Sequence, residues 1–73
     1  MSGKIDKTVN VGRFKGGEAQ VRTILVGQGF ETKTLALRSK DHTNEIWDIV
    51  LANGRKVQLV AQNKGDKVSI KEV

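Results

Sequence analysis

Apolar and polar residues alternate most regularly in two runs on either side of an Asn-Gly pair. The runs cover residues 46–51 and 57–61, and Asn53-Gly54 lies between them. Alternation with a period of two is typical of half-buried strands, and Asn-Gly between two such runs is a strong hairpin signal. The pattern therefore predicts an antiparallel hairpin, which we expect at the centre of a sheet.

The length of the hairpin loop decides which side chains share a face. A two-residue loop would place the apolar residues of the two strands on opposite faces, because a shift of one residue turns a strand over. A three-residue loop over 52–54, with its glycine in the left-handed conformation, pairs Ile49 with Val57 instead. The next pair in that register is Trp47 with Leu59. We predict the three-residue loop because it gathers the apolar residues on one face.

A helical spacing of apolar residues occurs over 18–26, where Val21, Ile24 and Leu25 fall at positions i, i+3 and i+4. A helix this short is not stable alone, so we expect it to pack on the sheet. Gly27 is predicted to end the helix in the left-handed conformation. Phe30, shortly after it, is predicted to cap the same core.

Three further strands complete the predicted sheet. The segment 33–38 alternates with Leu35 and Leu37 facing inward, and 67–71 continues the apolar face of the hairpin. A short N-terminal edge strand is predicted over 8–12. The predicted fold class is α+β: an antiparallel meander of about four strands, with one short helix packed on one face and this extra edge strand.

The connections between these strands are predicted to be short and polar. Residues 39–44 are expected to form a loop that contains the single histidine. A turn around Lys64-Gly65 would pair Asn63 with Asp66, and this register places Ala61 opposite Val68. The last strand then extends the same apolar face.

The chain has 73 residues, enough for one domain with a small core but not for a deep active-site cleft. We expect a flexible tail over 1–7 and a single domain over 8–73. The sequence contains no cysteine, no apolar leader at the N-terminus and no run of apolar residues long enough to span a membrane. These features favour a cytoplasmic protein that does not bind membranes.

Thirteen lysine and arginine residues against eight acidic residues give a net charge of +5. Such a balance favours acidic partners, which include nucleic acids and acidic protein surfaces. The charges are spread along the chain, however, and an ordinary solvated surface has the same composition. Charge alone therefore leaves the kind of partner open.

No arrangement of residues indicates catalysis, a metal site or a cofactor. Ser39, Asp41 and His42 lie within four residues on one predicted loop, which gives no scaffold to orient a base on a nucleophile. Glu45 and Asp48 are predicted to point to opposite faces of a strand. One histidine with scattered carboxylates is not a metal-ligand set. We therefore expect a protein that is not an enzyme and has no small-molecule substrate.

The segment 12–17, Gly-Arg-Phe-Lys-Gly-Gly, is predicted to be the most flexible part of the chain. Its glycines precede a helix, but the segment lacks the Gly-Lys-Ser/Thr ending of a phosphate loop. Arg13 and Lys15 are candidate contacts to a phosphate backbone. Because Phe30 and Trp47 are assigned to the core, Phe14 is the one aromatic left to stack on a base.

The order of turns and strands after the helix forms a pattern of its own: a Gly-aromatic pair, an aromatic-x-aliphatic strand, an Asn-Gly turn and a strand that leads to a last glycine turn. Its parts are Gly29-Phe30, Trp47-Asp48-Ile49-Val50-Leu51, Asn53-Gly54-Arg55, Val57-Gln58-Leu59-Val60 and Gly65 before Val68. In these parts, residues 21–73 resemble the PepSY-type domain. The resemblance implies a sheet-plus-helix architecture and a non-catalytic role. In size, charge and lack of cysteine, the chain also resembles small bacteriophage proteins that inhibit host RNA polymerase.

The predicted sheet has a second, polar face that can serve as a docking surface. Ile46, Val50 and Val60 would form its apolar centre, with lysines and an arginine as a charged rim. A sheet edge, over 8–14 or 68–73, is a further docking site, because a partner can add a strand there. The candidate partner-binding residues are Arg13, Phe14, Lys15, Lys33, Val50, Arg55, Lys56 and Val60.

Two functions from different classes follow from this sequence. We predict a regulatory or inhibitory protein that docks on the acidic surface of a larger macromolecular machine, such as the transcription apparatus with its RNA polymerase. The alternative is a direct, largely non-specific nucleic-acid-binding protein. A continuous basic stripe would favour nucleic acid, whereas an apolar centre with a charged rim would favour a protein partner.

Overall fold

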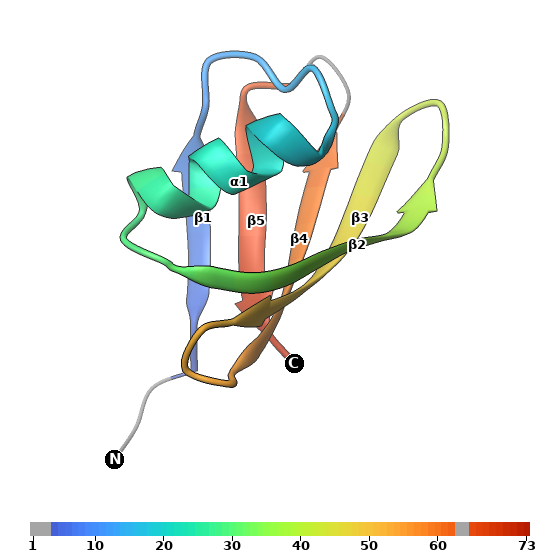
Figure 1. Ribbon diagram of the computed structural model, residues 1–73. Coiled ribbons are helices and arrows are strands. Elements are labelled where there is room, and N and C mark those ends of the chain that lie inside the picture. Colours follow the sequence, from blue (N-terminus) through green and yellow to red (C-terminus); the bar gives the residue numbers. More distant parts are fainter. Residues whose placement is uncertain (1–3, 63–64) are drawn as a thin grey trace.

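The computed structural model describes residues 4–62 and 65–73, which form one five-stranded antiparallel sheet and one helix (Figure 1). Along the chain, the elements are β1 (Asp6–Asn10), α1 (Glu18–Gly27), β2 (Thr32–Lys40), β3 (Asn44–Leu51), β4 (Lys56–Gln62) and β5 (Lys67–Glu72). In space, the strand order is β1-β5-β4-β3-β2. The predicted α+β class is confirmed: β2 to β5 form the meander, and β1 is the extra edge strand.

The central hairpin has the predicted register. Ile49 pairs with Val57 and Trp47 pairs with Leu59. The loop over 52–54 has three residues, and its glycine has a φ of 90°, in the left-handed region that favours glycine. The register of β4 with β5 is also as predicted, because Ala61 lies opposite Val68. The predicted pairing of Asn63 with Asp66 lies outside the described residues.

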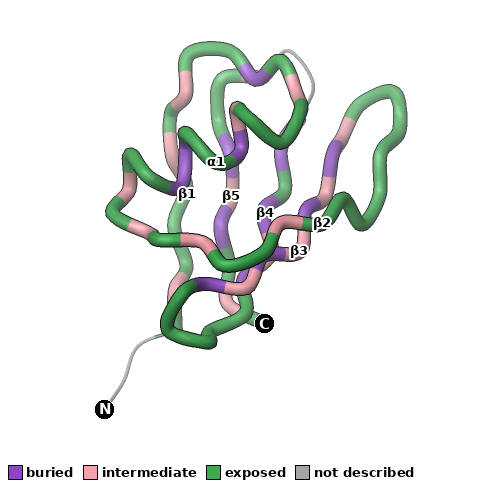
Figure 2. The backbone as a smooth tube through the Cα atoms, in the orientation of Figure 1, coloured by how far each residue is buried: buried purple, intermediate pink, exposed green. Residues whose placement is uncertain are grey.

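The core lies between α1 and the face of the sheet that α1 covers (Figures 1 and 2). The three helix residues predicted to face the sheet, Val21, Ile24 and Leu25, are all buried. Along β3, buried and half-buried residues alternate without a break. The whole buried apolar set is Phe14, Val21, Ile24, Leu25, Trp47, Ile49, Leu51, Val57, Leu59, Ala61, Val68 and Ile70.

The glycine that ends helix α1 lies two residues later than predicted. Gly27 is still helical, and Gly29 has the positive φ, 84°. The backbone N–H of Phe30 donates to the carbonyl oxygen of Leu25, and that of Gly29 to the carbonyl oxygen of Val26, both at 2.9 Å. This is the Schellman arrangement, in which an apolar residue after the turn packs on the last helical turn. The prediction for Gly27 was wrong because the packing of Phe30 against the core decides which glycine ends the helix.

The strands differ from their predicted bounds at both ends of the sheet. β1 begins at Asp6, within the segment predicted as a tail, and Ile5 packs against the core. β2 and β3 are longer than predicted, so the turn between them covers 41–43 rather than 39–44. Leu37 was predicted to face inward, but 47% of its surface is exposed. Edge strand β2 has neighbours on one side only, so register alone does not bury its side chains.

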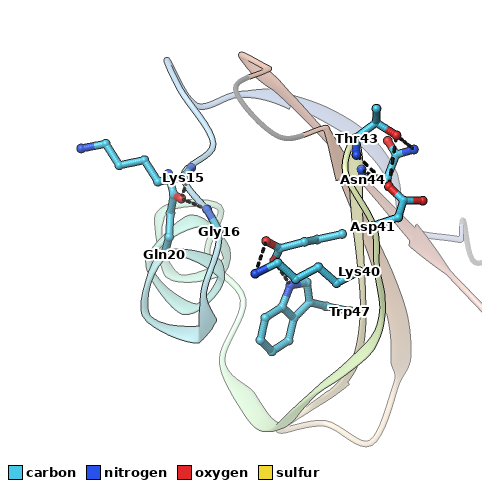
Figure 3. A network of polar contacts seen from close by, with 9 residues as sticks. Lys15, Gly16, Gln20, Lys40, Asp41, Thr43, Asn44 and Trp47 are labelled. Atoms are coloured by element: carbon cyan, nitrogen blue, oxygen red, sulfur yellow. Dashed lines mark hydrogen bonds and ion pairs between the residues drawn. The ribbon is translucent and has the colours of Figure 1, made fainter.

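The Gly-rich segment before α1 was predicted to be flexible but is anchored at several points. The N–H of Phe14 donates to the carbonyl oxygen of Gly65 at 2.8 Å. The side-chain oxygen of Gln20 accepts from the N–H groups of Lys15 and Gly16 at 2.7 and 3.0 Å (Figure 3). Its Nε2 donates to the carbonyl oxygen of Arg13 at 2.8 Å. One side chain of α1 thus satisfies three backbone groups of the segment.

Replacing Gln20 with alanine should release this segment. Three hydrogen bonds are lost, each with a net value near 1 kcal/mol that solvent exposure reduces, so we expect stability to fall by about 1–2 kcal/mol. Amide hydrogen exchange at Lys15 and Gly16 should become faster, which NMR can follow residue by residue. The control is Gln62→Ala, an exposed glutamine at the end of β4. Unchanged exchange at both amides would show that Gln20 does not hold the segment.

Candidate functional site

The second face of the sheet is not covered by any helix in the described part of the chain (Figure 1). We call it the open face and define it by the strand residues whose side chains alternate away from α1. The pairing register places these residues in rows across the strands. They are Asp6, Thr8, Asn10, Thr34, Ala36, Ile46, Asp48, Val50, Lys56, Gln58, Val60, Lys67, Ser69 and Lys71.

Aliphatic residues lie at the middle of the open face, on β3 and β4. Ile46 is paired directly with Val60, and Val50 is four residues further along β3. Ile46 and Val50 are half-buried, whereas Val60 is 36% exposed. Asp48 and Gln58 form the row between Val50 and the pair of Ile46 with Val60. Aliphatic residues grouped on an otherwise polar face mark interaction sites more often than single exposed ones do.

Cations border these aliphatic residues on both sides. Arg38 of β2 forms an ion pair with Asp48 across the face, with Nη1 3.1 Å from Oδ2. On the other side are Lys67 and Lys71 of β5, and Lys56 lies at the start of β4. Among the described residues, no carboxylate oxygen lies within 4.0 Å of the three lysine nitrogens. These lysines are therefore available to an acidic partner.

The carboxylate at the centre of the face is already engaged. Asp48 Oδ1 accepts a hydrogen bond from Nε2 of Gln58 at 3.3 Å, and its other oxygen faces Arg38. The positive and negative charges of this pair largely cancel. The charge that a partner meets is therefore that of the three lysines and of Asp6 on β1, which is paired with Lys71, and it is positive overall.

A depression of about 670 Å³ lies on the open face and reaches across four neighbouring strands. Small or short side chains of β2, Thr34 and Ala36, form one side of it, and Lys71 and Val73 form the other. Polar and aliphatic residues of β3 and β4 form its floor. The lining includes Val50 and Lys56 but neither Ile46 nor Val60, so the open face is hollowed toward the end where β4 begins.

Two β-bulges in β2 change which residues point toward the open face. The register shifts between Thr32 and Thr34 and again between Leu37 and Ser39, so Lys33 and Arg38 are the bulged residues. A bulge redirects side chains locally. Simple alternation would place Arg38 on the face opposite to Leu37, but its contact with Asp48 could not be predicted from the spacing.

The structure brings together only some of the predicted partner-binding residues. Val50, Lys56 and Val60 share the open face, and Lys33 lies at the bulge next to Thr34. Arg55 lies just before β4, two residues from the core-facing Val57, and does not belong to the open face. Its guanidinium lies 3.7 Å from a carboxylate oxygen of Glu72.

The other three predicted residues lie at the opposite end of the sheet. Arg13 and Lys15 are exposed beside the turn that joins β4 to β5, because the residue between them bonds to Gly65. Phe14, predicted to be exposed, is 1% exposed and belongs to the core. Arg13 and Lys15 therefore do not form one site with Lys56.

A buried carboxylate lies next to the glycine segment 12–17, where a phosphate would bind if this segment were a phosphate loop. Glu45 is 2% exposed, and its Oε1 accepts a hydrogen bond from Nε1 of Trp47 at 2.9 Å (Figure 3). The ammonium of Lys40 lies 3.9 Å from Oε2. Gly16, just before α1, packs against this carboxylate so closely that a Cβ there would collide with it. An anion already occupies this position, which disfavours a nucleotide phosphate.

The polar loop that holds Asp41 is organised as a tight turn. Oδ1 of Asp41 accepts from the N–H groups of Thr43 and Asn44 at 2.8 and 2.7 Å, and from the hydroxyl of Thr43 (Figure 3). These backbone hydrogen bonds lower the pKa of Asp41 from its usual value. The carboxylate has a structural role in closing the β2–β3 turn. Glu45 and Asp48 point to opposite faces, as predicted.

All three phenylalanine and tryptophan residues of the chain contribute to the core side of the sheet. Phe14 and Trp47 are buried, and Phe30 is half-buried against the core. The ammonium of Lys7 lies 5.2 Å from the centre of the Phe30 ring. None of these rings is presented on the open face, so that face has no platform for stacking bases.

Within residues 4–62 and 65–73, no group of three or more histidine or carboxylate side chains is arranged to hold a metal ion. No helix of this part is both long and apolar enough to cross a membrane. No protein-family profile, curated protein or solved structure matches the chain. The fold and the open face are therefore the findings on which a function can be proposed.

Proposed function

We propose that the protein acts by stoichiometric binding and not by catalysis, docking its open face on the acidic surface of a larger protein assembly that it regulates or inhibits. The observation that carries this proposal is the half-buried aliphatic centre on an uncovered sheet face. Its rim has three lysines without ion pairs among the described residues. An apolar centre with a charged rim is the usual organisation of a protein interface.

The position of the aromatic residues favours a protein partner over a nucleic acid. Proteins that bind single strands stack bases on exposed aromatic side chains, and here those side chains lie in or against the core. The cations along the sheet also do not join into one stripe. Between Arg13 and Lys56 lie, among the described residues of the open face, only Lys67 and Lys71 of β5, and Ser69 separates these two lysines. A continuous basic stripe was the feature that would favour nucleic acid.

The transcription apparatus is the assembly that we propose first. A small basic protein without cysteine suits an acidic cytoplasmic partner. Bacterial RNA polymerase is therefore the first purified assembly to test, with inhibition of transcription as the functional measurement. If the protein binds the polymerase without inhibiting transcription, the docking function is supported and the inhibitory function is contradicted.

Charge reversal on the open face should abolish this binding. We expect the double variant Lys56→Glu, Lys71→Glu to bind the assembly at least about tenfold more weakly, because rim charges then repel an acidic surface. The matched control is Arg13→Glu, Lys15→Glu, which makes the same change in net charge at the far end of the sheet. Its affinity should stay within about threefold. Surface plasmon resonance at about 50 and 200 mM salt gives both values.

The affinity of the protein for labelled single- and double-stranded oligonucleotides is measured at the same two salt concentrations. Micromolar binding that falls steeply with salt, and that Arg13→Glu, Lys15→Glu weakens, would support the alternative function instead. Equal loss of polymerase binding in both double variants would mean that net charge, and not the open face, governs association.

A further inference from the structure

The width of the depression indicates the kind of segment that fills it. Its lining comes from β2, β3, β4 and β5, which are adjacent in the sheet. Three spacings between neighbouring strands amount to about 14 Å. A helix with its side chains is about 10–12 Å across and fits this width, whereas a single extended chain would fill about one spacing and leave the rest open.

The spacing of the aliphatic residues indicates how far that segment extends, because Val50 lines the depression whereas Ile46 and Val60 lie beyond it on the same face. Ile46 and Val60 form one row, and Val50 is four residues further along β3. Four strand residues extend over about 13 Å. About nine residues of helix span the same distance, so aliphatic side chains at i, i+4 and i+8 of one helix can reach both rows.

The placement of charge indicates the composition of the helix. Arg38 borders the aliphatic residues on the β2 side, and Lys67 and Lys71 border them on the β5 side. A helix over β3 and β4 therefore meets cations along both flanks of its apolar stripe. Carboxylates on both flanks would complement them. A second copy of this chain is a poor complement, because both faces of a two-fold interface would then carry the same net positive charge.

Strand addition at a sheet edge is the competing mode of docking, and the edges disfavour it. β2 carries two bulges and the cations Lys33 and Arg38, and bulges and charges both protect an edge from pairing. β1 has only five residues. β5, predicted as an edge, lies between β1 and β4 and has no free side.

We infer that the segment of the partner that occupies the open face is an acidic amphipathic helix, lying over β3 and β4 as a third layer of the structure. This inference rests on the proposed function and adds the chemistry of the partner to it. The aliphatic residues of the helix contact Ile46, Val50 and Val60. Its flanking carboxylates pair with Lys71 on one side. On the other side they share Arg38 with Asp48, because Nη1 alone of that guanidinium donates to Asp48 and its other N–H groups can donate to the partner.

A designed peptide tests the inference without knowledge of the natural partner. The probe is a fluorescent peptide of about 18 residues, long enough to form a helix, with leucines on one face and glutamates on both flanks. The control peptide has the same composition in an order that spreads the leucines around the helix. We expect the amphipathic peptide to bind at least about tenfold more tightly, with amide chemical-shift changes concentrated on β3 and β4.

A matched pair of protein variants locates the contact. Val60→Glu places a carboxylate in the apolar centre and should weaken binding of the amphipathic peptide about tenfold. Val26→Glu makes the same substitution at an exposed position of α1, where 63% of the valine surface is accessible, and should leave binding within about twofold. Circular dichroism confirms that both variants are folded.

The outcomes separate the inference from the proposed function. Equal binding of the two peptides would overturn the inference that the partner segment is an amphipathic helix. The open face would then be a docking surface that recognises charge alone. If the protein binds the acidic assembly but neither peptide, the inference of a helical partner segment is overturned and the proposed docking function is retained. Binding of oligonucleotides, with neither peptide nor assembly bound, would overturn both.

Discussion

Replacing Phe14 with alanine is expected to lower the free energy of unfolding by about 3–5 kcal/mol, the usual cost of removing a buried phenylalanine ring. Phe14 is 1% exposed, and its backbone N–H is held by Gly65, so the structure has little freedom to close around the cavity. A domain of this size has only about 3–5 kcal/mol of net stability. The variant should therefore be largely unfolded at 25 °C, as measured by far-ultraviolet circular dichroism.

Two further variants make the effect of Phe14 measurable. Phe14→Leu retains most of the apolar volume and should cost about 1–2 kcal/mol, which keeps the protein folded for urea titration. Leu37→Ala removes an apolar side chain that is 47% exposed and should cost less than about 1 kcal/mol. A folded Phe14→Ala variant, within about 1 kcal/mol of the parent, would contradict the core position of this ring.

Replacing Gly16 with alanine is expected to cost about 2–5 kcal/mol, from two independent causes. Gly16 has a φ of 91°, and an L-residue there costs about 1–2 kcal/mol. The new methyl group would also displace the buried carboxylate of Glu45. Disturbing the hydrogen bond between that carboxylate and Trp47 adds about 1–3 kcal/mol. Urea unfolding gives the sum, and the NMR resonance of the Trp47 indole N–H reports the displaced carboxylate.

The two causes can be separated with a matched glycine. Gly12 has a φ of 78° and no atom near the position of a Cβ, so Gly12→Ala should show the backbone cost alone and an unchanged indole resonance. In a Glu45→Ala background, the added cost of Gly16→Ala should fall to about the Gly12→Ala value, because the carboxylate is then absent. Equal costs in both backgrounds would show that Gly16 and Glu45 do not contact each other.

The alternation of apolar and polar residues was sufficient to predict the register of the central strands. The three-residue loop between β3 and β4 follows from parity: only that register puts Ile49 and Val57 on one face, and burial of apolar surface contributes most to the stability of a fold. The same reasoning places Ala61 opposite Val68. Where neighbouring residues compete, the choice depends on tertiary contacts. Gly27 and Gly29 are equally good helix stops by sequence, and the packing of Phe30 selects Gly29.

The burial of Phe14 has no local signal. It lies among glycines and cations, the composition of an exposed loop, and the contact that anchors its backbone comes from Gly65 in the last turn of the sheet. Glu45 shows the same limit. Alternation places it on the core face, but only the structure shows that Trp47 and Lys40 provide partners for its carboxylate there.

About half of the candidate site could be predicted. Val50, Lys56 and Val60 share a face because their strands alternate in the predicted register. Lys67 and Lys71 could have been found by extending that parity to β5. Alternation from Leu37 also puts Arg38 on this face, but its contact with Asp48 could not be predicted, because the bulge before Ser39 changes the local direction of the side chain. Arg13 and Lys15 were grouped with Lys56 on charge alone, and charge does not indicate which end of a strand a loop occupies.

The position of β1 next to β5 has a consequence for how the protein folds. β2 to β5 form pairs between strands that directly follow one another, so each of those pairings closes a short loop. β1 pairs Lys7 with Ile70, and almost the whole described chain lies between the two. During synthesis on the ribosome, β1 emerges first and its partner emerges last. The hairpins can therefore form while β5 still has an open edge, and the slow, long-range closure by β1 completes the sheet.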